Sequence, residues 1–265
     1  MNRLILTQMR MFPREVALSE GRIMVTGAAR RVGRSTAIEL ARRGFDLVLT
    51  ARSSLEACRE TAELCQQASP NSIDVEVLEL ALESEDSIRS TCQQVAGGGV
   101  DGIVHNASAY RRTPIDTLQA QDLLELYHIN AVGPLLITSL LASNLRSSQL
   151  AGGGSVVCLG DLHADGHPRK EYVGYLASKA ALHQMVESLA LELAPTIRVN
   201  GIAPGVVAFA PGDMSAEAEQ RYVQRIPRAR SGTLEEAAYT VAWMLLDAHY
   251  VTGQVLNLCG GRSLH

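Results

Sequence analysis

The sequence predicts a single α/β domain: a Rossmann-like, doubly wound parallel sheet with helices on both faces. Short, mostly apolar segments alternate with helical segments along nearly the whole chain, which is the pattern of strands buried on both sides. Neither an internal repeat nor a linker interrupts this alternation in the 265 residues. One domain of this class therefore accounts for the chain.

The first half of the chain contains four predicted strands. Arg22–Thr26 leads through a glycine-punctuated turn into a helix over Arg34–Arg43, which ends at Gly44, a residue type that commonly ends helices. The elements that follow are strand Asp46–Thr50, helix Ser54–Gln67, strand Asp74–Leu80, helix Ser84–Val95 and strand Gly102–His105.

The second half begins with two long helices, each followed by a buried strand. These elements are helix Ala120–Arg146, strand Ser155–Leu159, helix Val173–Ala194 and strand Ile197–Ile202, and the chain closes with helix Leu234–Ala248 and strand Gln254–Leu258. Residues 206–233 are rich in Pro, Gly and charge, and we predict that they form a substrate-loop insertion. We expect residues 1–20 to be a disordered extension and residues 21–265 to be the folded domain.

Composition narrows the class of protein. A net charge of −4 gives no reason to expect a nucleic-acid partner, and no apolar run reaches the ~18–20 residues of a membrane span. Five scattered cysteines without a CxxC pair favour a reducing, cytoplasmic location, and the histidines show no spacing typical of a metal site. Small molecules and copies of the chain itself are the expected partners.

A phosphate-binding turn is predicted at "VTGAARRVGRSTA", residues 25–37, because it follows a strand and opens a helix. Gly27 permits a tight turn, and Gly33 lets the amide groups of the helix N-terminus approach a pyrophosphate. The alternative, since TGxxxxxG is a loose pattern, is an ordinary strand–helix turn.

The end of the second strand favours NADPH over NADH. Asp46 begins that strand, so it lies four or five residues, roughly 15 Å, from the edge where a ribose-binding acid is needed. The correct end reads "TARSS" and offers Arg52 and Ser53 instead, with Arg30 and Arg31 in the turn nearby. Arginine suits a 2′-phosphate, although these arginines could also be solvated surface charges.

The reaction residues are predicted in "GDLHADGHPRKEYVGYLASK", residues 160–179. Tyr175 and Lys179 are four apart on one helix, which brings their side chains within roughly 5–6 Å. At that separation an ammonium group is expected to lower the pKa of the phenol from near 10 toward about 8. No serine precedes this tyrosine, and Asp161 stands where a hydroxyl would polarise a carbonyl; the alternative role for Asp161 is a helix cap.

Taken together, these motifs resemble the short-chain dehydrogenase/reductase family over Arg22–Leu264. The matching motifs are TGxxxxxG (26–33), "HNAS" (105–108), Asn130 in "HINAVGP", YxxxK (175–179) and "RVNGIAPG" (198–205). The resemblance implies four catalytic residues: Asn130, Asp161, Tyr175 and Lys179. It also implies a cofactor site made of Gly27, Arg30, Arg31, Val32, Gly33, Arg52, Ser53, Asn106, Ala107, Ser108, Tyr175, Lys179, Pro204 and Gly205.

Within that family the chain looks closest to the pteridine reductases. Their turn carries arginine where relatives have a middle glycine, as in "TGAARRVG", and they carry Asp after the fifth strand, as in "DLHAD". An aromatic residue follows the Asn-Ala-Ser stretch in "NASAY". The resemblance implies a substrate site of Arg31, Ser108, Tyr110, Asp161 and Tyr175, although Tyr110 could also be a half-exposed loop aromatic.

These observations predict an NADPH-dependent reductase that converts dihydropterins to tetrahydropterins. A carboxylate would repel the oxyanion that forms on a ketone, whereas a pterin gains its proton at nitrogen. The alternatives are a carbonyl reductase with a serine-free site and a catalytically silent NADP-binding scaffold. The resemblance also implies that the two long helices pair across subunits in a homotetramer, unless they only cover the sheet.

Overall fold

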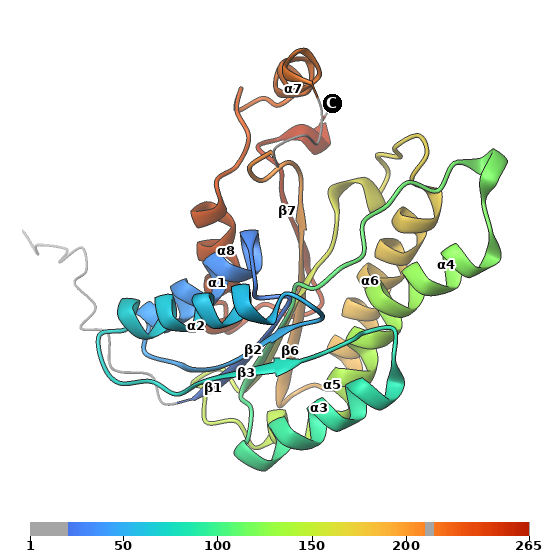
Figure 1. Cartoon of the computed structure of the whole chain (residues 1–265). Coiled ribbons are helices and arrows are strands. Elements are labelled where there is room, and N and C mark those ends of the chain that lie inside the picture. The colour runs from blue at the N-terminus through green and yellow to red at the C-terminus, as the bar shows by residue number, and fades with distance from the viewer. Residues whose placement is uncertain (1–20, 210–214, 265) are drawn as a thin grey trace, which may run out of the picture.

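The computed structural model describes residues 21–209 and 215–264, so the predicted extension over 1–20 lies outside the described residues. Seven strands form one all-parallel sheet in the order β3-β2-β1-β4-β5-β6-β7 (Figure 1). The strands are β1 Arg22–Thr26, β2 Asp46–Ala51, β3 Val75–Glu79, β4 Gly102–His105, β5 Gly154–Leu159, β6 Ile197–Pro204 and β7 Val255–Leu258. The predicted fold class is confirmed, and no predicted strand is missing.

The strand order reverses between β1 and β4, which are neighbours through pairs such as Met24 with Ile103. From β1 the chain builds outward to β2 and β3, and from β4 it builds in the other direction. In doubly wound sheets, ligands bind outside the carboxyl ends of the strands at such a reversal. The fold therefore predicts the site at the ends of β1, β4 and β5.

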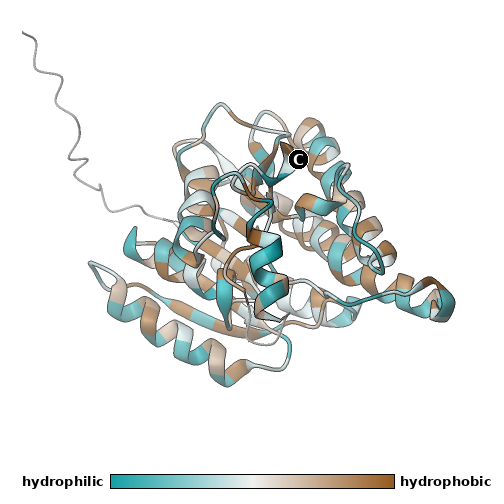
Figure 2. Ribbon diagram, turned by 90° about the horizontal axis from the view of Figure 1, so that it is seen from above, coloured by the Kyte–Doolittle hydropathy of each residue, from teal (hydrophilic) through white to brown (hydrophobic). Residues whose placement is uncertain are grey.

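Helices cover both faces of the sheet (Figure 1). The helices α1 (Arg31–Arg42), α2 (Leu55–Ala68) and α8 (Leu234–Leu246) pack on one face, whereas α3 (Glu85–Gly98), α5 (Gly133–Arg146) and α6 (Val173–Glu192) pack on the other. Met24 and Val25 are adjacent on β1 and belong to the two separate cores, because successive strand side chains point to opposite faces. Figure 2 shows hydrophobic residues along the strands and on inner helix faces, with hydrophilic residues outside.

The predicted helix over Ala120–Arg146 is interrupted in the structure. It consists of α4 (Ala120–Tyr127), a π-helical turn over His128–Val132, and α5. Pro134 has no amide hydrogen to donate to the Asn130 carbonyl four residues earlier, which weakens regular α-helical bonding at this point. The whole run is long and apolar enough to cross a membrane, but 56% of its apolar window is buried, as expected for a core helix.

The region predicted to be an irregular insertion contains a further helix, α7 (Ala216–Val223), among its described residues 206–209 and 215–233. Three short 3₁₀ turns complete the described structure: Ile115–Thr117, Leu162–Ala164 and Arg262–Leu264. The last two of them, with α7, lie beyond the carboxyl ends of the central strands.

Candidate active site

The turn after β1 has the close packing that a phosphate-binding turn requires. Gly27 has a φ of 67°, and a Cβ there would lie 2.9 Å from Ala107 Cα. A Cβ on Gly33 would lie 2.3 Å from the Gly27 carbonyl oxygen, so only glycine fits this approach of helix to strand. Arg31, in the position where relatives have a glycine, has a φ of 52°, the left-handed conformation that glycine adopts most easily.

Asn106 and Ala107 hold this turn in place from β4. The Asn106 side-chain amide donates to the carbonyls of Thr26 and Gly27, at 3.0 Å each. The amides of Asn106 and Ala107 both donate to Thr26 Oγ1, also at 3.0 Å. These residues were predicted as cofactor contacts, and their polar groups form the wall that shapes the turn.

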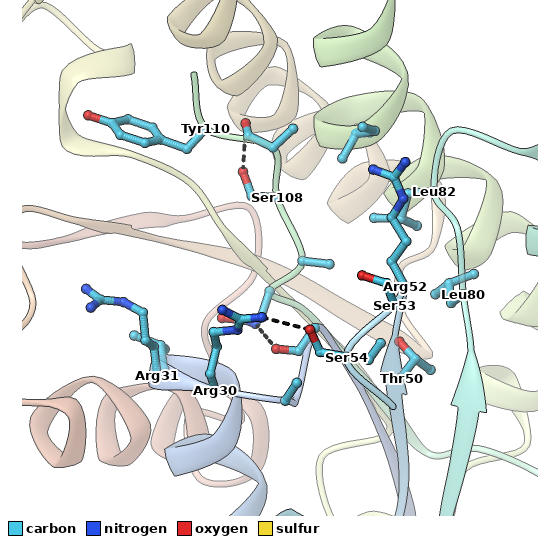
Figure 3. Close-up of a pocket in the computed structure, with 18 of the residues that line it drawn as sticks. Arg30, Arg31, Thr50, Arg52, Ser53, Ser54, Leu80, Leu82, Ser108 and Tyr110 are labelled. Carbon is cyan, nitrogen blue, oxygen red and sulfur yellow. Dashed lines mark hydrogen bonds between the residues drawn. The ribbon is translucent and has the colours of Figure 1, made fainter. Parts of the chain in front are cut away.

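A pocket of about 550 Å³ extends from this turn across the ends of β2 and β3. Figure 3 shows Arg30, Arg31 and Arg52 at this pocket with Ser53, while Tyr110 lies on its far side. Asp46 begins β2, so no carboxylate of that strand reaches the pocket. The glycine cradle and the size of the pocket fit a dinucleotide.

The two arginines at the edge of the pocket, Arg30 and Arg52, each contact a side chain that was not predicted from the sequence. Arg30 donates to Ser54 Oγ at 2.7 Å, and Arg52 Nε lies 2.7 Å from Glu83 Oε1. Glu83 follows β3. Its position beside Arg52 at the end of β2 could be predicted only by knowing that β3 and β2 are neighbours in the sheet. Arg30 and Arg52 thus both line the pocket, with the Glu83 carboxylate beside them.

A cleft adjoins the nucleotide pocket, and Tyr175 and Asp161 form a hydrogen bond inside it. Tyr175 Oη donates to Asp161 Oδ2 at 2.8 Å, and the other carboxylate oxygen accepts the amide of His163 at 2.8 Å. Asp161 therefore both caps the turn Leu162–Ala164 and faces the phenol. The loop that follows is closed by a contact of 2.7 Å between His163 Nδ1 and the carbonyl of His167.

The expected lowering of the Tyr175 pKa is wrong for this arrangement. The pKa of Tyr175 is raised well above its usual value by burial and by the adjacent Asp161 carboxylate. Lys179 is buried, donates to the Leu159 carbonyl at 2.6 Å, and has its pKa lowered to about 8 by desolvation, against the opposing effect of Asp161. Burial first, and then the carboxylate, outweigh any effect of the ammonium group on the pKa of the phenol.

Asn130 lies in the π-helical turn, and its side chain is fully used in hydrogen bonds. It donates to the Ala109 carbonyl and to Ser178 Oγ, and it accepts from the Ala109 amide and from Ser108 Oγ, all at 2.9 Å. The side chain thus links the segment after β4 to α6, the helix that carries Tyr175 and Lys179. The catalytic role expected for Asn130 stays a prediction, and its side chain, with every hydrogen-bonding group engaged, could serve it only by positioning its neighbours.

Tyr110 belongs to a small aromatic cluster above the Tyr175–Asp161 pair. Its ring stacks on Tyr172 at 5.0 Å and meets Tyr175 edge-on at 4.8 Å, yet it remains 53% exposed. Arg169 donates to Tyr110 Oη at 2.7 Å and lies 4.6 Å from the centre of the Tyr172 ring. The sequence analysis missed Tyr172 and Arg169, although Tyr172 lies one helical turn before Tyr175.

Arg31 connects the phosphate turn to the start of the 206–233 region. Its guanidinium donates to the carbonyls of Val207 and Ala208, at 3.2 and 2.7 Å. Gly205, with Pro204, lines the same cleft, and its amide donates to Leu258 on β7 at 3.0 Å. Residues far apart in sequence therefore close one wall of the cleft.

This cleft has a volume of about 700 Å³ and joins the nucleotide pocket. Five of the predicted residues line both: Arg31, Val32, Asn106, Ser108 and Tyr110. The cleft is also lined by side chains that sequence reasoning did not single out, namely Arg112, His163, Arg169, Tyr172, Phe209 and Tyr222. One continuous site can hold a dinucleotide with its reactive end beside Tyr175.

The known proteins that this chain resembles include several named as reductases. The family model described as enoyl-(acyl carrier protein) reductase matches residues 27–263. A 3-oxoacyl-[acyl-carrier-protein] reductase from Aquifex aeolicus is 31% identical over 93% of this chain and 99% of its own length. A carbonyl reductase family member 4 from Danio rerio is 32% identical over 91% of this chain and 97% of its own.

Among solved structures, acetoin dehydrogenase YohF from Salmonella typhimurium superimposes with a TM-score of 0.81, at 29% identity, over 92% of this chain and 96% of that one. None of these three relatives is named as a pteridine reductase, so the matches establish the family without its branch. The glycine turn, the Tyr175–Lys179 pair and the order of the strands agree with these matches. The chain belongs to the short-chain dehydrogenase/reductase family of nicotinamide-dependent oxidoreductases.

Proposed function

We propose that the protein is an NADPH-dependent reductase that converts dihydropterins to tetrahydropterins. The observation that carries this proposal is the 2.8 Å hydrogen bond from Tyr175 Oη to the Asp161 carboxylate inside the cleft. A carbonyl substrate needs a neutral or cationic donor at its oxygen as negative charge develops there. A carboxylate in that place suits a heterocycle that presents N–H groups and gains its proton at nitrogen.

The chemistry divides between cofactor and chain. Bound NADPH would supply the hydride, and the chain would supply the proton that reaches the ring nitrogen. Tyr175 and Asp161 share one proton between them, and this proton is the one positioned for transfer. The buried ammonium of Lys179 compensates the negative charge that remains on the pair, and solvent at the open cleft then restores the proton.

Recognition of the flat ring would come from three sides. Tyr110 offers an exposed aromatic ring, and an offset stack on it contributes about 0.5–1.5 kcal/mol beyond the buried area. The Asp161 carboxylate accepts hydrogen bonds from an amino-pyrimidine edge. Arg31, between the nucleotide pocket and the cleft, can face both the pyrophosphate and the polar edge of the substrate.

The preference for NADPH is supported by Arg30 and Arg52 at the end of β2, where NAD-selective sites place an acid. Glu83 partly neutralises Arg52, so Arg30 is the cation with no carboxylate partner in the described residues. A cytoplasmic location is supported by the five cysteines, none of which forms a disulfide.

A second candidate, a reductase of ordinary carbonyl compounds, is favoured by the names of the relatives. One is called a 3-oxoacyl-[acyl-carrier-protein] reductase, another a carbonyl reductase and a third an acetoin dehydrogenase. This candidate requires a hydroxyl in place of Asp161, and in the described cleft Ser108 is the serine available, with its hydroxyl donated to Asn130.

The purified protein should be assayed with NADPH and with NADH against 7,8-dihydropterins and against a panel of ketones including acetoin. We expect turnover of dihydropterins, with kcat/KM at least about tenfold higher for NADPH, the effect of one well-placed charged hydrogen bond. Turnover of ketones alone would refute the pterin proposal. Binding of the nucleotide with no turnover of either class would favour a silent scaffold.

A further inference from the structure

A second hollow, of about 430 Å³, opens beside the catalytic cleft and is strongly cationic. Six of the ten residues that line it are arginine or lysine: Arg112, Arg169, Lys170, Arg221, Arg225 and Arg262. Within the described chain, no aspartate or glutamate lines it. Its walls come from the segment before α6, from α7 and the residues just after it, and from the C-terminal turn.

Four of the six cations of this hollow lack a carboxylate partner in the described residues. Arg112 lies 3.5 Å from Glu171, but four others have no ion-pair partner in the part of the chain that the structure describes: Arg169, Lys170, Arg221 and Arg225. The protein as a whole carries more acidic than basic side chains, with 28 against 24. The positive charge of the hollow is therefore opposite in sign to the net charge of the protein. Such a cluster of positive charges raises the local concentration of anions.

The hollow is continuous with the reacting groups. Four residues line both it and the cleft: Arg112, His163, Arg169 and Tyr222. His163 is bonded through its amide to Asp161, and its ring Nε2 lies 3.4 Å from Tyr222 Oη. Arg169 donates to the hydroxyl of Tyr110, so the cations begin beside the aromatic ring on which the substrate is proposed to stack.

We propose that the natural substrate carries an anionic group on the side chain of its ring, and that this hollow binds that group while the ring is reduced. The inference rests on the proposed reductase function. Arginine guanidinium groups bind phosphates and carboxylates in a forked geometry, and both are candidates for the anion. A phosphate ester on a polyol side chain and the carboxylates of a glutamyl side chain are the two sources that the test distinguishes.

The test compares three 7,8-dihydropterins with NADPH: one with a neutral polyol side chain, its phosphate ester, and one that ends in glutamate. The variant is R221Q/R225Q, because Arg221 and Arg225 line the hollow but not the catalytic cleft. R59Q/R89Q is the matched control, since it removes two exposed arginines of α2 and α3.

We expect the wild type to prefer one anionic substrate by about tenfold or more in kcat/KM, the effect of a charge-assisted bond. R221Q/R225Q should abolish the preference through KM, leave kcat and the neutral substrate unchanged, and differ from the control. Added salt should weaken the preference. Equal kcat/KM for neutral and anionic substrates in the wild type, or an equal loss for both in the variant, would overturn the inference.

If ketones are reduced but no pterin is, the proposed function fails. The anion site is then tested by comparing kcat/KM for 5-oxohexanoate with kcat/KM for its ethyl ester. Preference for the acid that is lost in R221Q/R225Q would support the anion site independently of the pterin proposal. Absence of any preference for the acid would overturn it.

Discussion

The two carboxylate oxygens of Asp161 accept hydrogen bonds from two different parts of the site. One oxygen accepts the His163 amide and ends the strand β5 in a defined turn, while the other accepts the phenol of Tyr175. A cap and a catalytic carboxylate were the two roles expected for Asp161; the structure shows the cap, and the contact of the second oxygen with the phenol is compatible with the proposed catalytic role.

Asp161→Asn separates the two roles. The amide oxygen can still accept from His163, and asparagine is as good a cap as aspartate, so we expect little change in thermal stability. Removal of the charge and of the shared proton should lower kcat for dihydropterins by at least about 100-fold. Steady-state kinetics with a parallel melting curve checks this; an unchanged kcat would show that Asp161 only shapes the loop.

The pKa of Lys179 sets the expected pH dependence. Burial lowers it to about 8, so the ammonium is present below that pH and is lost above it. We expect kcat/KM for NADPH, which reports the cofactor-free enzyme, to be flat below pH 8 and to fall about tenfold per pH unit above it. The raised pKa of Tyr175 keeps the phenol protonated over the same range. A profile that stays flat to pH 9.5 would contradict this assignment.

Contacts between side chains can be predicted from the sequence where the residues have a fixed spacing on one helix. Contacts between residues that are distant in the sequence cannot be predicted in this way. Tyr175 and Lys179 share a helix, so their proximity follows from four-residue spacing. Arg169 meets Tyr110 across 59 positions, and no local pattern signals that contact. The direction of the Tyr175 pKa was predicted wrongly because burial and the bond to Asp161 outweigh the lysine.

Among the elements, α8 has an unusual termination. The last carbonyls of a helix have no partner within it, and here a buried arginine from β6 supplies one. Arg198 donates to the carbonyls of Met244, Leu245 and Ala248 at 3.1, 2.6 and 3.0 Å. A positive charge at a helix C-terminus also interacts favourably with the helix dipole.

Arg198→Met should therefore destabilise the protein without touching the active site. Methionine keeps most of the buried volume but leaves these carbonyls unsatisfied, which we expect to cost about 3 kcal/mol of unfolding free energy. The melting temperature should fall by roughly 6–12 °C for a chain of this size. Arg146→Met, on an exposed arginine of α5, is the control; equal melting temperatures would show that solvent replaces the lost bonds.

Elements were predicted well where burial fixes them. β1 and β4 have the predicted bounds, since their apolar runs are delimited by charge or glycine. The π-helical turn at His128–Val132 was not predicted, because hydrophobic periodicity alone does not reveal one extra residue in a turn. Helix α7 was also not predicted, since its sequence is polar and follows a proline- and glycine-rich stretch.

At the scale of the whole molecule, six of the fourteen large apolar side chains that are exposed in the described residues lie on the helices expected to pair across subunits. Leu124 on α4 is 62% exposed and Leu191 on α6 is 84% exposed, while Tyr127 and Leu140 add smaller areas on α4 and α5. Several exposed apolar side chains on neighbouring helices are typical of protein–protein contacts. The homotetramer remains a proposal that this surface supports.

Light scattering on the protein as it elutes from a size-exclusion column should give the mass of four chains. Leu124→Glu combined with Leu140→Glu should reduce it to that of one or two, because each buried carboxylate would lack a partner. Leu64→Glu, at a comparably exposed leucine of α2, should leave the mass unchanged. A wild-type mass of a single chain would refute the tetramer.

Arg31 reaches from the first turn of the domain to Val207 and Ala208, and the amide of Gly205 is held by Leu258 near the C-terminus. The site therefore exists only once segments from both ends of the described domain have come together. A nascent or partly refolded chain would lack a working cleft even with its first strands formed. Regain of turnover after denaturation would thus serve as a stringent gauge of complete renaturation.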